Sequence, residues 1–294
     1  MNIILIFNGL GNQMSQYAFC LAKKQYNSHV NFLYFPDKNV NQHNYFELED
    51  VFSINESRGH INSLLNYVYG LFDYAESHKG RKGKLLKTIL KYLGVNLIVE
   101  NSNYDYDSSY LLNKTIGTFF YYGGWHSEKY FSNIKTQIND SFKFNVNLLD
   151  VMNLEILKEV CERTSVSIHI RRCDYLQTPF KDVSTIEYYK KAINYIEERI
   201  EKPFYFIFSD DIVWVKQNFD IPNSMIVDNN KAKDSWKDMY LISKCKHNIN
   251  ANSTFSWWGA WLNDNTEKIV ITPRKFSLLY ESNDIYPESW VKID

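Results

Sequence analysis

Hydrophobic and polar positions in the second half of the chain predict alternating strands and helices. Leu154–Arg163 has helical spacing, and Val166–Arg171 alternates apolar with polar residues, which predicts a strand with one buried face. Tyr188–Glu201 predicts an amphipathic helix. The apolar run Phe204–Phe208 is typical of a strand buried in a parallel sheet. Three further strands are predicted, at Met225–Val227, Asn248–Ala251 and Ile269–Thr272.

The first third of the chain begins with the same order of elements. Met1–Phe7 predicts a strand, and the turn Gly9-Leu-Gly-Asn-Gln13 leads into a helix with one apolar face. Val30–Phe35 predicts the next strand, whereas residues 41–150 are less regular. Strands alternating with helices predict an α/β fold with parallel, doubly wound sheets. We expect two such domains facing a cleft, residues 1–150 and 151–294.

Composition restricts the class of protein. The 294 residues are 45% hydrophobic and 23% charged, as in soluble globular proteins, and the net charge of -1 gives no argument for a nucleic-acid partner. The four cysteines are far apart, without the spacing of a zinc site or a disulfide framework. The first apolar run is too short for a signal peptide, and no segment reaches the ~18 apolar residues of a membrane span. We therefore expect a cytoplasmic protein.

Three polar segments follow predicted strands: Gly9–Gln13, His169–Tyr175 and Asn252–Gly259. In open α/β sheets, ligands bind beyond the carboxyl ends of strands. Arg171 and Arg172 offer planar, permanently charged forks that suit phosphate oxygens, although an isolated Arg-Arg pair is more often ion-paired at a surface. Ser253 or Thr254 can cap the helix that follows, which leaves backbone N–H groups for an anion.

The glycine turn does not complete a dinucleotide-binding fingerprint. The third glycine of that fingerprint would fall at Met14, and no acidic residue ends the second predicted strand. What remains is a turn in which Gly11 lets a ligand approach the backbone, with Asn12 and Gln13 as neutral partners for sugar hydroxyls. The alternative is a tight turn before a helix, which needs the glycines alone.

Two acidic motifs have competing interpretations. After the run ending at Phe208, Asp210 of the pair Asp210-Asp211 can accept hydrogen bonds from a guanine edge or a ribose, or the pair can cap the helix that contains Trp214. Asp105-Tyr-Asp107 can hold a divalent cation and a diphosphate, or can belong to a solvated loop. We favour the loop, because the arginines and the helix start already neutralise negative charge.

Residues 79–93 are basic and have an apolar stripe at helical spacing. No acidic residue lies between Glu76 and Glu100, and the stripe consists of Leu86, Ile89, Leu90 and Leu93. A basic amphipathic helix can lie on an anionic membrane surface. The alternative is a helix that packs on its own domain and has a solvated basic face.

Taken together, the motifs resemble glycosyltransferase family 11, the bacterial α-1,2-fucosyltransferases. The matching segments are Gly9-Leu-Gly-Asn-Gln-Met-Ser-Gln-Tyr-Ala18, His169-Ile-Arg-Arg-Cys-Asp-Tyr175, Phe206-Ile-Phe-Ser-Asp-Asp211 and Cys245-Lys-His-Asn-Ile-Asn-Ala-Asn-Ser-Thr-Phe-Ser-Trp-Trp-Gly-Ala-Trp-Leu-Asn263. They span nearly the whole chain in order. Ser15 stands where the family often has Phe, and Cys173 where it often has Gly.

The resemblance implies a GT-B-like fold and an inverting enzyme without metal or cofactor. It implies transfer of L-fucose from GDP-β-L-fucose to the 2-hydroxyl of a galactose-terminated oligosaccharide, an acceptor that can be lipid-linked. Arg171 would bind the diphosphate, and Asn12 would lie near the acceptor hydroxyl together with Gln13. The expected donor site comprises Gly11, His169, Arg172, Ser209, Asp210, Ser253, Thr254 and Phe255.

The expected mechanism stabilises charge on the leaving GDP. Arg171, Arg172 and the helix start at Ser253 would act where that charge develops. Asp174 and His169 are the candidate bases nearest to this motif, and we count Arg171, Asp174 and Asn12 as the catalytic residues. Two alternatives stay open: a metal-dependent transferase using Asp105 and Asp107, and a non-catalytic sugar- or nucleotide-binding protein.

Overall fold

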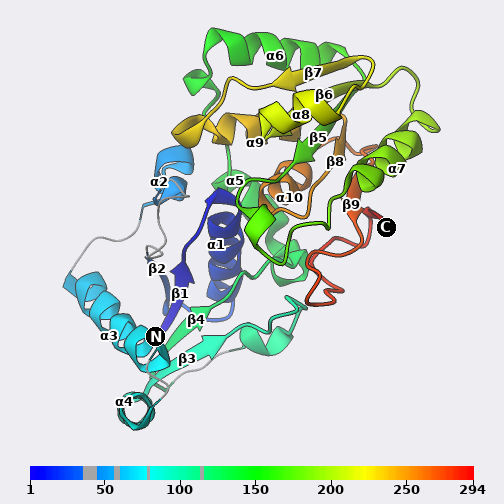
Figure 1. The fold of residues 1–294 in the computed structure, drawn as a ribbon. Helices are drawn as coiled ribbons and strands as arrows, with labels where there is room; N and C mark the ends of the chain where they lie inside the picture. The colour runs from blue at the N-terminus through cyan, green and yellow to red at the C-terminus, as the bar shows by residue number, and fades with distance from the viewer. Residues whose placement is uncertain (36–44, 56–59, 78–79, 113–115) are drawn as a thin grey trace. The chain divides into compact units, whose positions relative to one another are not determined.

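The computed structural model describes residues 1–35, 45–55, 60–77, 80–112 and 116–294, drawn as coloured ribbon in Figure 1. The described residues form two compact units, one that ends at Phe142 and one that comprises Lys143–Asp294. The second unit therefore begins at Lys143, whereas the sequence placed a domain boundary near residue 150.

The first unit is built on a parallel four-stranded sheet in the order β2-β1-β4-β3. Its strands are β1 (Asn2–Ile6), β2 (Val30–Tyr34), β3 (Val95–Val99) and β4 (Thr118–Tyr122). Its helices are α1 (Leu10–Lys24), α2 (Glu47–Phe52), α3 (His60–Ser77), α4 (Arg81–Tyr92) and α5 (Lys135–Ser141). Because β1 pairs with both β2 and β4, the strand order reverses between β1 and β4, and this is where open sheets bind ligands.

The second unit is built on a parallel six-stranded sheet in the order β10-β9-β8-β5-β6-β7. Its strands are β5 (Ser165–Ile170), β6 (Phe204–Ser209), β7 (Ser224–Val227), β8 (His247–Ile249), β9 (Val270–Pro273) and β10 (Val291–Ile293). Its helices are α6 (Val151–Glu162), α7 (Ile186–Glu197), α8 (Ile212–Asn218), α9 (Trp236–Lys244) and α10 (Thr254–Trp261). The chain runs outward from β5 to β7 and then returns to place β8 beside β5, so the strand order reverses between β5 and β8.

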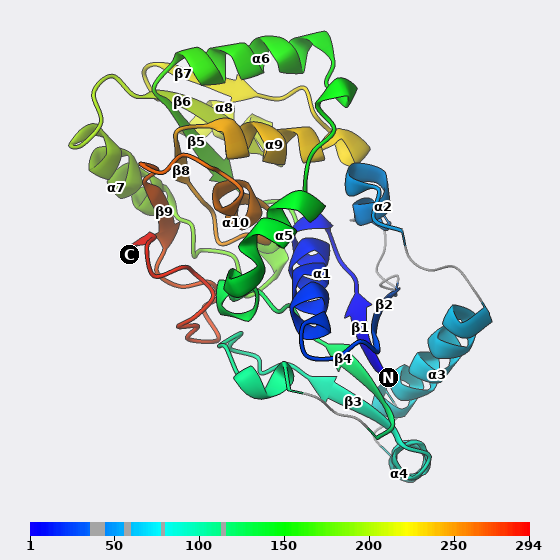
Figure 2. The same cartoon turned by 180° about the vertical axis from the view of Figure 1, so that it is seen from behind.

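Helices cover both faces of the second sheet (Figures 1 and 2). On one face, Phe206 and Phe208 of β6 pack with residues of α6 and α9. On the other face, Ile168 of β5 and Ile207 of β6 pack with residues of α7 and α8. The doubly wound parallel arrangement predicted from the sequence is therefore present in this unit.

Two predicted patterns need correction. All six residues of β5 are buried, because the strand lies in the middle of a sheet covered on both faces, so the expected half-buried strand is wrong. In α4, Leu90 is buried and Leu86 packs on the core, but Ile89 and the C-cap residue Leu93 are exposed. The expected stripe is therefore divided between the core and the surface.

Candidate functional site

The reversal point of the second sheet gathers the polar segments found in the sequence. Arg171 follows β5, Asp210 follows β6, and Ser253 follows β8 after a short turn. Because the strands are parallel, their carboxyl ends meet at one edge of the sheet. All the predicted donor-site residues except Gly11, which lies in the first unit, thus come together on the second unit.

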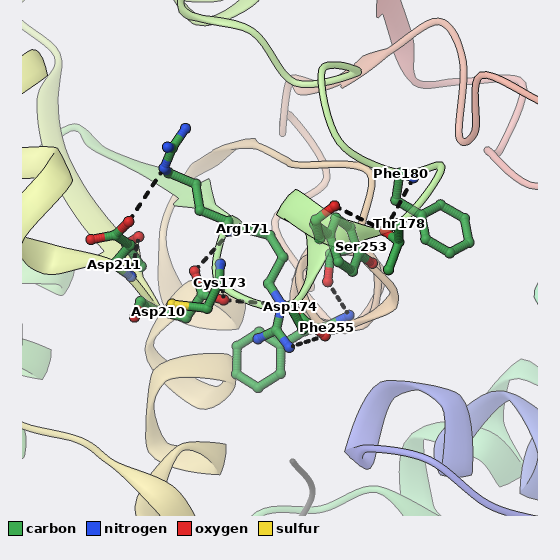
Figure 3. Close-up of polar contacts among 12 residues, drawn as sticks. Arg171, Cys173, Asp174, Thr178, Phe180, Asp210, Asp211, Ser253 and Phe255 are labelled. Atoms are coloured by element: carbon green, nitrogen blue, oxygen red, sulfur yellow. Dashed lines mark hydrogen bonds and ion pairs between the residues drawn. The ribbon is translucent and has the colours of Figure 1, made fainter. Parts of the chain in front are cut away.

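Arg171 is held by two carboxylates at this edge (Figure 3). Its Nε donates to Oδ1 of Asp174 at 2.8 Å, and its Nη2 donates to Oδ2 of Asp174 at 2.9 Å. Nε also lies 3.2 Å from Oδ2 of Asp210. An arginine carries five N–H groups in a rigid fork, so this pairing fixes the guanidinium while leaving N–H groups for a ligand.

Asp210 holds the loop that follows β5. Its two oxygens accept hydrogen bonds from the backbone N–H groups of Arg172, at 2.9 Å, and of Cys173, at 3.2 Å. Burial raises the pKa of Asp210, whereas Arg171 and these backbone donors lower it. Asp210 thus has protein partners at both oxygens, and its geometry favours support of Arg171 over recognition of a base or ribose. Ser209 accepts a hydrogen bond from the N–H of Asp211.

Arg172 points to different partners from those of Arg171. Its guanidinium carbon lies 3.8 Å from the ring centroid of Trp214, and its Nε lies 3.4 Å from Oδ2 of Asp211. Asp211 also caps α8 by accepting a hydrogen bond from the N–H of Trp214. The capping interpretation of the Asp-Asp pair is therefore confirmed for Asp211, and Arg171 is the arginine better placed at the sheet edge.

His169 ends β5 beside the start of α10. Its ring lies 5.4 Å from that of Phe255, and its backbone carbonyl accepts a hydrogen bond from the hydroxyl of Tyr189. Burial and, to a smaller extent, the nearby charge of Arg171 together lower the pKa of His169 to about 3. The imidazole is therefore neutral at physiological pH, with one nitrogen that donates and one that accepts.

The start of α10 has the cap expected from the sequence. Ser253 is the N-cap, and its side chain accepts a hydrogen bond from the N–H of Phe255. Thr254 and Phe255, the first two helical residues, are partly exposed at this end. Trp257, Trp258 and Trp261 are buried, which confirms that the tryptophans belong to the core.

Charge alone does not make this edge an anion site. The two arginines share it with three carboxylates, those of Asp174, Asp210 and Asp211. The geometry instead provides a fixed guanidinium beside a capped helix start, whose dipole favours negative charge. This arrangement suits a diphosphate that takes the remaining Arg171 donors.

Asn252, which the sequence analysis assigned no role, ties three loops together. Its side-chain N–H group donates to the carbonyls of Phe180 and Phe276, and its oxygen accepts a hydrogen bond from the hydroxyl of Ser184. An asparagine directly before a helix cap was the available signal. The loop from Arg171 to Ser184 is thereby fastened next to the start of α10.

The first unit places the glycine turn at the reversal point of its own sheet. Asn8 has a left-handed φ of 63°, and Gly9 is the N-cap of α1. Gln13 is fully buried: its Nε2 donates to the carbonyls of Asn8 and Tyr45, and its Oε1 accepts from the N–H of Leu48. Gln13 thus shapes the turn. Gly11 is buried, whereas Asn12 is partly exposed.

Glu100, missed by the sequence analysis, lies at the same edge of the first unit. One oxygen of its buried carboxylate accepts hydrogen bonds from the N–H groups of Gly124, at 2.7 Å, and Trp125, at 2.9 Å. Burial raises the pKa of Glu100 by more than these two hydrogen bonds lower it, which brings the pKa to about 7. A Cβ on Gly123 would stand 2.8 Å from Oε2 of Glu100, so only glycine lets the segments approach.

His126 and Ser15 connect this edge to the glycine turn. Nδ1 of His126 lies 3.0 Å from the hydroxyl of Ser15, which donates to the carbonyl of Gly11. Burial lowers the pKa of His126 to about 3, so the ring is neutral. The small side chain of Ser15, noted as a departure from the family, makes room for this contact.

The second acidic motif forms local turns in the first unit. Asp105 accepts a hydrogen bond from the side chain of Asn103. Asp107 accepts one from the N–H of Ser109 and caps the short 3-10 helix Ser108–Tyr110. Within the described residues, no group of three His, Cys, Asp or Glu side chains is arranged to hold a metal ion. These contacts suit the loop interpretation.

Comparison with known sequences gives one result for the whole chain. The family model described as Glycosyl transferase family 11 matches residues 1–294. An alpha-1,2-colitosyltransferase of Escherichia coli is 31% identical over 300 residues, which cover 97% of this chain and 96% of the relative. The O-antigen biosynthesis glycosyltransferase WbnK of the same organism is 43% identical over 160 residues. That match covers 52% of this chain and about half (53%) of the relative's length.

More distant proteins share shorter segments or the fold. A galactoside alpha-(1,2)-fucosyltransferase 1 of Leontocebus fuscicollis is 31% identical over 106 residues, 34% of this chain and 29% of the relative. The crystal structure of the fucosyltransferase NodZ from Bradyrhizobium superposes with a TM-score of 0.50 and 13% identity, covering 88% of this chain and 90% of NodZ. At that identity the likeness shows the fold alone, and the expected GT-B-like α/β class is confirmed.

Proposed function

The chain belongs to glycosyl transferase family 11 and is a glycosyltransferase, and from this premise we propose that it is a galactoside α-1,2-fucosyltransferase. It moves L-fucose from GDP-β-L-fucose to the 2-hydroxyl of a galactose-terminated oligosaccharide, with inversion at the sugar carbon. The observation that carries this proposal is the fixed Arg171 guanidinium beside the capped start of α10. Both groups stabilise negative charge, which is what the leaving GDP develops.

The roles of the site residues follow from their contacts. Arg171 binds the diphosphate through the N–H groups that Asp174 does not use, and Asp174 and Asp210 keep its fork in place. Thr254 and Phe255, at the start of α10, bind the same diphosphate. In the first unit, we assign the acceptor contact to Asn12, because the side chain of Gln13 is occupied by the turn. The reaction needs no metal or cofactor.

A second donor is favoured by one comparison. One relative that matches nearly the whole chain is an alpha-1,2-colitosyltransferase, whereas the match to a galactoside alpha-(1,2)-fucosyltransferase covers 34% of the chain. A nucleotide-activated colitose is therefore the alternative donor for the same α-1,2 transfer. The acceptor in either case is a glycan precursor of the kind that O-antigen enzymes extend.

The test is a transfer assay with each donor and a set of galactosides. Release of GDP that depends on the acceptor, with a product carrying an α-1,2-linked fucose by NMR, supports the proposal. Turnover with the colitose donor but not with GDP-fucose selects the alternative. Donor binding without GDP release for any acceptor would identify a non-catalytic binding protein.

We also propose that the enzyme works at the cytoplasmic face of a membrane and contacts it through α4. Leu85, Ile89 and Tyr92 lie at helical spacing and are 62%, 45% and 92% exposed. Basic residues surround them, and the sequence has no acidic residue between Glu76 and Glu100. Charge complementarity therefore selects an anionic bilayer, which takes both exposed apolar and basic side chains. Among the described residues, no helix has the length and apolar character needed to cross a bilayer.

A further inference from the structure

On the face of the second sheet that α9 covers, polar side chains form a row across neighbouring strands. We call the row of Ser167, Asn248 and Asn263 the first rung. Nδ2 of Asn248, in β8, donates to the hydroxyl of Ser167, in β5, at 2.8 Å, and to the carbonyl of Ile242, in α9, at 2.9 Å. Nδ2 of Asn263 donates to Oδ1 of Asn248 at 2.8 Å. Side chains of this first rung therefore satisfy one another directly.

A second rung lies two residues further toward the carboxyl edge. Since side chains alternate along a strand, His169 is on the same face as Ser167, and Asn250 is on the same face as Asn248. Ser167 is paired with Asn248, so His169 lies beside Asn250. The N–H of Asn250 donates to the carbonyl of Ile271, which places Thr272 on its other side. The second rung is thus His169, Asn250 and Thr272, which are 5%, 1% and 0% exposed.

Unlike the first rung, the second contains four buried polar atoms without partners. None of His169 Nδ1, Asn250 Nδ2, Asn250 Oδ1 and Thr272 Oγ1 has a hydrogen-bond partner among the described residues. Buried polar atoms are nearly always hydrogen-bonded, to protein or to ordered water. A buried water makes about three such bonds and bridges groups of this kind. The rung supplies an amide donor, an amide acceptor, a hydroxyl and a ring nitrogen.

We propose that His169, Asn250 and Thr272 bind a buried water, and that Asn250 and Thr272 are positioning residues which fix the tautomer of His169. Nδ1 of His169 is the buried ring nitrogen without a partner, so we assign Nδ1 to the water and leave Nε2 to contact the donor. A neutral imidazole with a fixed tautomer offers the donor either a hydrogen-bond donor or an acceptor, and never a mixture of the two. This consequence for donor affinity rests on the proposed function, whereas the water site does not.

Thr272→Val tests the proposal, because it removes the hydroxyl and keeps the shape of the side chain. The matched control is Ser167→Ala, which removes a buried hydroxyl from the first rung on the same face. The measurements are the 15N chemical shifts of the His169 ring and the Kd for GDP by calorimetry. We expect Thr272→Val to mix the two tautomers and to weaken GDP binding about two- to tenfold, the range that one hydrogen bond contributes. Ser167→Ala should lower the Tm while leaving both readouts at the wild-type values.

Unchanged His169 shifts in a folded Thr272→Val protein would overturn the proposal, as would equal shift changes in Thr272→Val and Ser167→Ala. If the wild type binds no GDP but Thr272→Val still mixes the His169 tautomers, the water site stands and the donor assignment fails. A crystal structure at high resolution should also show a water within hydrogen-bonding distance of Asn250 and Thr272, and direct contact between their side chains would contradict it.

Discussion

Both carboxylate oxygens of Asp174 accept hydrogen bonds from the guanidinium of Arg171, three residues earlier in the chain. A bidentate pair of this kind fixes the plane of the guanidinium as well as its position. The sequence placed Asp174 among the catalytic residues as a candidate base. The geometry favours a different role, in which Asp174 orients the arginine that receives the diphosphate.

Asp174→Asn separates these two roles. The amide keeps the size of the side chain and one acceptor for Arg171, so an orienting residue should lose about tenfold in turnover, as expected for one weakened charge-assisted hydrogen bond. Loss of a general base costs about 10²–10⁴ in rate. The measurement is kcat from GDP release at saturating donor and acceptor. A loss of about 10⁴ in kcat, in a protein with the wild-type Tm, would identify Asp174 as the base after all.

Glu100 should make stability depend on pH near neutrality. Burial raises its pKa from 4.5 to about 7 in the folded protein. Because folding favours the protonated carboxyl, the stabilisation that Glu100 contributes is complete below pH 4.5 and is lost as the pH rises through 7. This stabilisation is at most about 3 kcal/mol. Glu100→Gln cannot ionise and still offers one oxygen to the N–H groups of Gly124 and Trp125. The Tm of the variant should therefore rise relative to the Tm of the wild type as the pH is raised from 5 to 8. A constant difference across this range would show that Glu100 ionises normally.

Activity should survive millimolar EDTA, because Arg171 and the start of α10 take the place of a cation at the diphosphate. Asp105 and Asp107 are engaged in local turns. A double Asp105→Asn/Asp107→Asn variant should therefore keep wild-type turnover. Loss of activity with the chelator, restored by Mn²⁺ or Mg²⁺ in the wild type but not in the double variant, would support the metal-dependent alternative instead.

The α4 surface predicts binding to anionic vesicles. Replacing Lys82, Lys84 and Lys91 with Gln should weaken binding to phosphatidylglycerol vesicles by about fivefold or more per lysine, since each contributes about 1 kcal/mol near such a surface. Leu85→Ser/Ile89→Ser should weaken it further. The control replaces Lys158, Lys190 and Lys216 of the second unit, which removes the same charge elsewhere. Sedimentation should distinguish the variants, and equal binding by both lysine variants would remove α4 as the membrane contact.

The sequence predicted the second unit better than the first, for a physical reason. Strands buried on both faces, such as β6, are continuous apolar runs, and a helix such as α7 shows its buried face at regular spacing. In the first unit, β4 reads Thr-Phe-Phe-Tyr-Tyr within a stretch rich in aromatic residues, and periodicity did not separate it from its surroundings. The short edge strand β10 was missed because three residues carry too little pattern.

The sequence also predicted which segments form the candidate donor site, but not how they are paired. Residue order places Arg171 and Ser253 at strand ends, whereas the partners of Arg171 depend on side-chain directions that no spacing reveals. Glu100 escaped notice because its partners are backbone N–H groups, which have no signature in the sequence. Asn250 directly follows the short strand β8, and its unpartnered amide becomes apparent only once its neighbours are known.

The most direct test of the account is GDP release by Arg171→Lys at saturating donor and acceptor, measured beside a melting curve. Lysine keeps the charge that balances Asp174 and Asp210 but loses the planar fork, so the fold should be retained. Arg171→Ala is less informative, because it leaves both carboxylates without their cation. The account predicts a loss of about 10²–10³ in kcat for Arg171→Lys, the effect of removing one preorganised donor to a developing anion. A folded Arg171→Lys enzyme with near-normal turnover would show that the leaving group binds elsewhere.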